Sequence, residues 1–420
     1  MAGHIQDRWY KSEPDANGKL RRVKTDRHGT GLRYRARYIG PDGTEKSKSF
    51  PDRQKRLAEK WLAQVDADMT RGQYVDPRAS RTTFRQYAEK WLDSLGAEPS
   101  TVASMRSQLG GHAFPLIGSR PLGAFQPEHI REWVAVMERS GVPGPYARAI
   151  YSNVRAVLSA AVDDGYLSRN PCSVRSVRQP AVERKRVVPW PVERVFAVRE
   201  AMPARYRAMV ELGAGCGMRQ GEILGIAVDA LDFTEGTLHV VQQLKLSAGA
   251  PVFAPPKGGK LRDVPLPGPV ADALKEHMKL HPPADITLPW RRPDGEKVTK
   301  RLLFTAPGGN HVWRTSLNEG AWKPALVAAG VIPAPESAEE SYQAAREHGM
   351  HALRHFYASA LLDGGENIKA VSEYLGHSDA AMTLRVYAHL MPSSRERTRK
   401  AIADAFGRLP GSTPRPTDGP

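Results

Sequence analysis

Two stretches rich in proline and charge divide this chain of 420 residues, and they limit the size of any core it can build. Residues 72–80 contain Pro77, and residues 173–188 contain Pro180 among five basic side chains. A chain of this length exceeds one ordinary core, and breaks of this composition are typical of linkers. We therefore expect three modules over residues 1–75, 82–178 and 187–407, and a disordered Pro/Gly/Thr-rich tail over residues 408–420.

The charge balance narrows the choice of partner. Lys and Arg total 61 against 45 Asp and Glu, which gives a net charge of +16. This surplus favours a nucleic acid, because neutralising its phosphates releases counterions. An anionic membrane is the competing partner, but we find no clear basic amphipathic helix or lipidation signal.

The composition also predicts a compartment. No apolar run reaches the roughly 20 residues of a membrane span, and the N-terminus carries no apolar signal segment. The two cysteines, Cys172 and Cys216, lack metal-ligand spacing. We therefore expect a cytoplasmic protein with reduced thiols and without a membrane partner.

The N-terminal module has a strand pattern with one basic face. Arg33, Arg35 and Arg37 alternate with apolar and aromatic residues over 31–39, a turn follows at 40–43, and residues 45–50 and 52–70 predict a second strand and a helix. The basic face either enters a DNA groove or belongs to a solvated hairpin. Residues 1–25 are polar and basic, and we expect poor order there.

The middle module is predicted to be helical throughout residues 82–172, and the last module mixes helices with three short strands. Between them, Arg184, Lys185 and Arg186 either follow a DNA backbone or form an exposed tether. The stretch 280–345 is rich in proline and charge and predicts an inserted surface loop without an assignable role.

Five segments in the last module carry candidate chemistry. Taken singly, each of their residues fits a structural role, such as an arginine at a helix start or a lysine at a hairpin tip. The candidates in chain order are Arg219 and Glu222 in 215–224, Lys257 in 256–266, His351 and Arg354 in 351–355, His377 in 375–378, and Tyr387 in 385–389.

Together and in this order, the five segments resemble the tyrosine recombinase, or phage integrase, family. The resemblance is strong over residues 189–400 and looser over the two N-terminal modules, which match in layout. It implies a multidomain, mainly α fold with α+β parts. The expected parts are a small sheet-and-helix arm-binding module, a helical, SAM-like core-binding domain and a mixed α+β catalytic domain.

The resemblance also implies a role for each candidate. Tyr387 attacks the phosphodiester and forms a 3′-phosphotyrosyl ester, while Arg219 and Arg354 hold the phosphoryl oxygens with help from His377. The remaining candidates are Lys257 as general acid, His351 as proton acceptor and Glu222 as an orienting group. No metal, ATP or other cofactor is implied.

The resemblance implies double-stranded DNA attachment sites as substrate, a homotetramer on DNA and a possible accessory bending or excision factor. We expect an integrase of a phage or other mobile element, associated with the nucleoid. Less favoured are a chromosome-dimer resolvase, a type IB topoisomerase, an RNA-binding protein and a catalytically inactive DNA-binding regulator or architectural protein. A short apolar stripe at residues 401–406 packs either on its own domain or on a neighbouring subunit.

Overall fold

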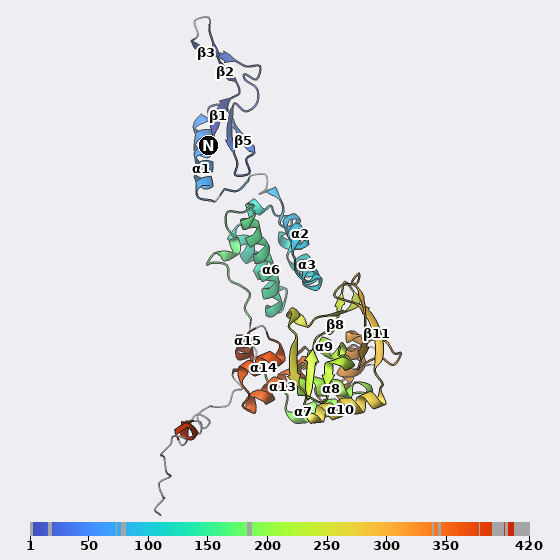
Figure 1. Cartoon of the computed structure of the whole chain (residues 1–420). Helices are drawn as coiled ribbons and strands as arrows, with labels where there is room; N and C mark the ends of the chain where they lie inside the picture. Colours follow the sequence, from blue (N-terminus) through green and yellow to red (C-terminus); the bar gives the residue numbers. More distant parts are fainter. Residues whose placement is uncertain are drawn as a thin grey trace, which may run out of the picture. The chain divides into compact units, whose positions relative to one another are not determined.

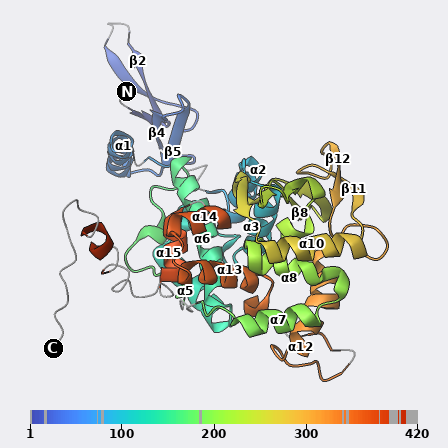
Figure 2. The ribbon, with the colours of Figure 1, turned by 60° about the horizontal axis from the view of Figure 1, so that its bottom comes forward.

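The computed structural model forms two compact units, Met1–Arg184 and Lys185–Pro420. It describes residues 3–15, 19–72, 74–76, 81–182, 187–337, 340–342, 346–377, 379–388, 399 and 402–406. Figure 1 shows each unit as a ribbon, and Figure 2 shows the same ribbon turned by 60°. The expected tail at 408–420 lies outside the described residues.

The first unit begins with a small antiparallel sheet and one helix. The sheet has the order β1-β4-β5. The helix α1 contacts strands β1, β4 and β5 (Figure 1). The elements are β1 (His4–Asp7), β2 (Tyr10–Pro14), β3 (Leu20–Lys24), β4 (Tyr34–Ile39), β5 (Glu45–Phe50) and α1 (Lys55–Thr70).

Period-two alternation determines which face of β4 is buried. Tyr34, Ala36 and Tyr38 are buried, and the arginines between them face away from this core. The expectation of poor order over residues 1–25 was wrong for the part that the structure describes. There β1 pairs with β4, and β2 pairs with β3 as a separate ribbon.

Helices make up the rest of the first unit. Thr83 caps α2, and its capping box with Gln86 satisfies two backbone N–H groups. The helices enclose an apolar core that contains Trp133 and Tyr151. They are α2 (Phe84–Ser94), α3 (Pro99–His112), α4 (Phe114–Ile117), α5 (Pro127–Arg139) and α6 (Gly144–Asp163).

The second unit packs helices around three short β elements. These are a three-stranded sheet of order β10-β7-β6 and the hairpins β8-β9 and β11-β12. The strands are β6 (Leu231–Asp232), β7 (Thr237–Val240), β8 (Gln243–Ser247), β9 (Ala250–Ala254), β10 (Arg262–Pro265), β11 (Ala284–Pro289) and β12 (Lys297–Leu302).

The helices of this unit bury one continuous core. They are α7 (Val192–Ala201), α8 (Ala204–Cys216), α9 (Gln220–Leu224), α10 (Gly268–Leu280), α11 (Arg314–Leu317), α12 (Lys323–Ala328), α13 (His351–Asp363), α14 (Ile368–Leu375) and α15 (Ala380–Tyr387), with a π-helical turn at Asn318–Trp322. In the part of the chain that the structure describes, no helix is both long and apolar enough to cross a membrane.

The stretch 280–345 is not the surface loop that the sequence predicts. Its described residues include the hairpin β11-β12, α11, the π-helical turn and α12. Leu302, Phe304 and Trp322 are buried in the core of the second unit. The polar residues that suggested a loop lie on the exposed sides of these elements, as Lys297, Thr299 and Arg301 alternate with less exposed neighbours on β12.

Candidate active site

A buried carboxylate lies at the centre of the candidate site. Glu222 is 0% exposed and accepts hydrogen bonds from the backbone N–H and Nη1 of Arg219, both at 2.9 Å. It also accepts from Nη1 and Nη2 of Arg262, at 3.0 and 2.6 Å. Burial acts to raise the pKa of Glu222, but these donors and both positive charges hold that pKa below its ordinary value. Glu222 is therefore an anion that fixes two guanidinium groups.

Arg262 was missed by the sequence reading. It lies on β10, where the burial alternates from residue to residue, and its side chain is on the inward face with 5% of its surface exposed. A cation at an inward strand position requires a buried anion, which Glu222 supplies. That inward position within Arg-Asp-Val-Pro is the signal that could have identified it.

Cationic side chains also donate hydrogen bonds to the end of α14 and to the turn that follows it. A helix leaves its last carbonyl groups without intrahelical partners, and its C-terminus has negative character. Four consecutive carbonyls, from residue 374 to residue 377, receive one cationic side chain each. The donors are Arg262 to Tyr374 at 2.7 Å, Arg354 to Leu375, Arg219 to Gly376 at 3.2 Å and Lys260 to His377 at 2.6 Å.

This arrangement explains why glycine stands at position 376, between Leu375 and His377. Gly376 has φ +59°, a left-handed conformation in which a side chain is strained. A Cβ there would also lie 3.1 Å from Cδ of Arg262. Glycine therefore lets the turn approach the arginine cluster closely.

Glycine at position 221, next to Glu222, also has a structural reason. A Cβ at this position would lie 3.0 Å from the carbonyl oxygen of Leu244 on β8. A serine there would require β8 to shift by a few tenths of an ångström. Close approach of helix α9 to this strand favours glycine.

Arg354 is the most buried cation of the site. It is 1% exposed, and its Nη1 donates to the carbonyl of Gly217 at 2.7 Å. Burial, with the charge of Arg219 next, lowers the pKa of Arg354 to about 9. The guanidinium therefore remains protonated near neutral pH, and it joins the turn before α9 to the turn after α14.

The histidines next to these arginines are held neutral. Burial, followed by the charge of Arg354, lowers the pKa of His377 to about 4. Its Nδ1 lies 2.8 Å from Oγ1 of the fully buried Thr383. His351 is at the first position of α13 and is exposed, and partial enclosure with the neighbouring positive charges lowers its pKa as well. Each ring can therefore accept or donate a hydrogen bond near neutral pH.

Tyr387 is buried at the end of α15. Its side chain is 1% exposed, and its Oη lies 2.7 Å from Nδ1 of His355 on α13. Burial raises the pKa of Tyr387 to about 12, against a lowering by the charge of Arg354. His355 is not among the candidates from the sequence, because its partner lies on another helix.

Lys257 lies at the tip between β9 and β10. It is exposed, and among the described residues it makes no hydrogen bond or ion pair. Gly258 and Gly259 follow with φ of +79° and +70°, which turns the chain toward Lys260 and its contact with His377. The tip therefore reaches the same turn, with the Lys257 amine available to a ligand.

A pocket of about 550 Å³ adjoins the motif residues within the second unit. Arg219 and His351 form part of its wall, and Arg314 and Lys323 add two cations from the stretch 280–345. Gln220 donates to Asn318 at 2.7 Å, which ties α9 to the π-helical turn. The stretch thus forms one side of the candidate site.

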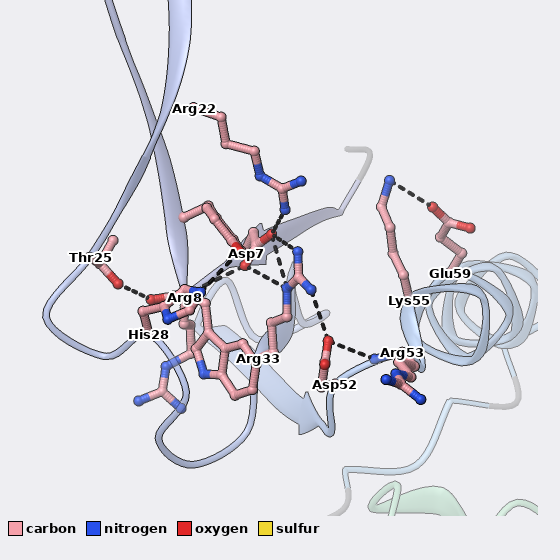
Figure 3. A network of polar contacts seen from close by, with 12 residues as sticks. Asp7, Arg8, Arg22, Thr25, His28, Arg33, Asp52, Arg53, Lys55 and Glu59 are labelled. Carbon is pink, nitrogen blue, oxygen red and sulfur yellow. Dashed lines mark hydrogen bonds and ion pairs between the residues drawn. The ribbon is translucent and has the colours of Figure 1, made fainter.

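The N-terminal arginines have different surroundings. Figure 3 shows Arg33 joining two carboxylates, with Asp7 at 3.0 Å and Asp52 at 2.8 Å. Arg35 donates to Ser47 at 2.9 Å on the exposed sheet face, and Arg37 pairs with Glu45. Arg33 therefore holds Asp7 and Asp52 together within the N-terminal module. The linker candidates Arg184, Lys185 and Arg186 lie outside the described residues.

Comparison with known proteins identifies the group to which this chain is similar. The model described as Phage integrase family matches residues 190–393, and the one described as Phage integrase central domain matches residues 84–176. The chain belongs to the phage integrase family. It is a tyrosine recombinase, an enzyme of site-specific DNA recombination, and its fold class is as the sequence predicts.

Named relatives agree with this assignment. The Tyrosine recombinase XerC-like protein of Caldanaerobacter subterraneus subsp. tengcongensis is 27% identical over 66% of this chain and 70% of its own length. The Putative prophage phiRv2 integrase of Mycobacterium tuberculosis is 27% identical over 85% and 88%. The Integrase of Mycobacterium phage L5 is 26% identical over 92% and 97%.

Solved structures show the same fold. The Tn1549 transposon integrase in complex with a circular intermediate DNA matches with a TM-score of 0.61 and 20% identity, over 77% of this chain and 99% of that chain. The lambda integrase tetramer bound to a Holliday junction matches with a TM-score of 0.53 and 16% identity, over 83% and 91%.

Proposed function

We propose that this integrase cleaves and rejoins double-stranded DNA at attachment sites through a covalent 3′-phosphotyrosyl bond to Tyr387. The observation that carries the proposal is the convergence of Arg219, Arg354 and His377 on the turn after α14. Two guanidinium groups and a neutral imidazole at one place form a binding site for phosphoryl oxygens.

Charge stabilisation at this site is prepared before substrate arrives. Glu222 holds Arg219 and Arg262, and the α14 carbonyls hold Arg354. An accessible donor that is already oriented, such as Arg219, needs little rearrangement as negative charge develops on a phosphoryl oxygen. Arg219 has 22% of its side chain exposed, so it is the arginine that a phosphate reaches first.

The exposed amine of Lys257 suits the role of general acid. The leaving 5′-oxygen must take a proton as its bond to phosphorus breaks. A glycine-flanked tip lets the amine follow the DNA strand, and the Lys260 contact keeps that tip close to His377.

The remaining surfaces suit a DNA substrate. We assign the exposed face of the N-terminal sheet, with Arg35 and Arg37, to contacts with DNA arms. Arg314 and Lys323, beside the catalytic pocket, are placed to bind phosphates that flank the cleaved one.

Assembly as a homotetramer is part of the same proposal, because one of the structures that this fold resembles is named as a tetramer on a Holliday junction. The element moved would be a phage or another mobile element, as the names of the relatives suggest. A protein that acts on chromosomal DNA would be cytoplasmic and nucleoid-associated, and an accessory bending or excision factor remains part of the hypothesis.

A suicide-substrate assay tests this function. A nicked duplex carrying the attachment site, found in genomic DNA that flanks the element, is incubated with wild type, Tyr387→Phe and the control Tyr206→Phe. We expect a covalent band for wild type and for the control, and none for Tyr387→Phe. Binding of this DNA by wild type without any covalent band would contradict the enzyme and favour an inactive DNA-binding regulator.

A further inference from the structure

The two histidines of α13 differ in their relation to Tyr387. His351 and His355 lie four residues apart, so both face the same side of the helix. Nδ1 of His355 is 2.7 Å from Oη of Tyr387, while among the described contacts His351 has no hydrogen bond to that oxygen. The ring in direct contact with the attacking atom is therefore His355.

The two imidazole rings also touch each other. Their centroids are 4.8 Å apart and their planes are nearly perpendicular at 84°. His351 is exposed, whereas His355 is half-buried. The ring of His355 thus lies between the buried Oη of Tyr387 and the exposed ring of His351.

The surroundings keep His355 without a proton in the resting state. Burial and the positive charge of Arg354 lower the pKa of His355. Other groups with which it interacts are His351 on its own helix, Tyr387 on α15 and His377 after α14. Within the part of the chain that the structure describes, none of these contacts is with a carboxylate, which would favour the protonated ring.

We propose that His355 is a catalytic residue, which accepts the phenolic proton of Tyr387 during cleavage and returns it during religation. The role assigned to His355 depends on the proposed strand-transfer function. It adds a residue to that site, and it assigns the direct contact with the nucleophile to His355 in place of His351.

The step balances as follows. The Oη–H bond of Tyr387 breaks and its proton passes to Nδ1 of His355, while an Oη lone pair forms the bond to phosphorus. The P–O5′ bond breaks, and the leaving oxygen takes a proton from Lys257. In religation the 5′-hydroxyl attacks phosphorus and returns its proton to the Lys257 amine, while the P–Oη bond breaks and the phenolic oxygen recovers its proton from His355. No oxidant or further reactant is consumed.

Helix geometry supports this assignment. His355 follows Arg354 directly on α13, so the proton acceptor and a phosphate-binding cation are carried by one rigid element. Any movement of this helix that brings Arg354 to the phosphate brings His355 with it. The nucleophile, on α15, then meets both groups together.

His355→Asn is the decisive variant. The side-chain amide of asparagine reaches the position of Nδ1, so it keeps a hydrogen-bond acceptor for Tyr387 but cannot hold a proton. We expect unchanged binding of the nicked DNA. The cleavage rate at neutral pH should be lower than that of wild type by a factor of about 100 or more. The rate of the variant should rise steeply at alkaline pH, where hydroxide removes the phenolic proton.

A substrate with sulfur in place of the leaving 5′-oxygen distinguishes the loss of the general acid from the loss of the general base. Sulfur departs without a proton, so this substrate should restore cleavage by Lys257→Ala but not by His355→Asn. His239→Asn changes a histidine on β7 that pairs with Asp263 and should cleave as wild type does.

Three outcomes would overturn the assignment. They are a His355→Asn rate within about 3-fold of wild type, a defect that is the same at every pH, and rescue of His355→Asn by the sulfur substrate. Failure of the proposed function has a different signature, because wild type itself would then give no covalent band on either substrate.

Discussion

Replacing Glu222 by glutamine removes the carboxylate that holds Arg219 and Arg262 together. The new amide has nearly the same volume, so the change is one of charge and of donors. Its NH₂ group must face at least one guanidinium N–H, which leaves two donors opposed. Arg262, with 5% of its side chain exposed, then has no compensating anion from this position.

The size of the effect follows from the burial of both partners. Removing one member of a buried ion pair costs about 3–5 kcal/mol, because the other charge remains without solvent. Glu222 is 0% exposed, so solvent screening offers little relief. A free energy change of 1 kcal/mol shifts Tm by about 2–4 °C in a unit of this size, so we expect a loss of roughly 10 °C.

Thermal and urea unfolding of the full chain measure this loss. Trp190 and Trp322 stack at 6.1 Å in the core of the second unit, so their fluorescence reports its unfolding. The control Glu200→Gln breaks surface pairs with Arg199 and Arg207 and should cost about 0–1 kcal/mol. The double variant Glu222→Gln/Arg262→Met should recover most of the stability, because the other partner of Glu222, Arg219, has 22% of its side chain exposed to solvent.

The pH dependence provides a second check with a defined sign. The folded-state pKa of Glu222 lies below its ordinary value of 4.5. Its stabilisation is therefore fully present above pH 4.5 and is lost as pH falls through the lowered pKa. Wild type should lose stability in this acid range faster than Glu222→Gln does. A Glu222→Gln variant that loses less than about 1 kcal/mol at neutral pH would refute the reasoning.

Four further changes test other parts of the molecule. Thr383→Val removes the hydroxyl next to His377, and covalent-complex formation should fall about 10-fold with DNA affinity unchanged in a binding titration. Gly376→Ala forces a side chain into the left-handed region and should destabilise the second unit by about 1–3 kcal/mol in urea unfolding. Arg33→Met should increase proteolysis and hydrogen exchange of the N-terminal module, whereas Arg35→Ala should lower affinity for arm DNA and reduce its salt dependence without such an increase.

Local signals in the sequence explain which site elements could be predicted. Arg219 is an N-cap, and Gly376 is a left-handed C-cap, so both turns have short-range determinants. The order of the motif residues indicated the family. What no local pattern contains is the position of one helix against another, which is why the contact between His355 and Tyr387, 32 residues apart, went unnoticed.

Two errors in the fold have a common cause. Residues 1–25 and 280–345 carry many polar and charged side chains, and such composition suggests loops or disorder. Short edge strands such as β1, with the sequence His-Ile-Gln-Asp, form because a neighbouring strand completes their hydrogen bonds. The apolar triplet Leu302-Leu303-Phe304 was the available sign that the second stretch contributes to a core.

The burial of Tyr387 and Arg354 has a consequence for how the enzyme engages substrate. Tyr387 is 1% exposed as a residue, so a phosphate cannot reach its hydroxyl group, and Arg354 is equally buried with both Nη atoms donating to backbone carbonyls. Arg219 and Lys257 are accessible. The scissile phosphate must therefore bind first to the accessible cations, and the groups that cover Tyr387 and His355 must then open before Tyr387 can attack. Because the α14 carbonyls and a phosphate compete for the same guanidinium donors, binding of DNA itself can supply the free energy that opens the site.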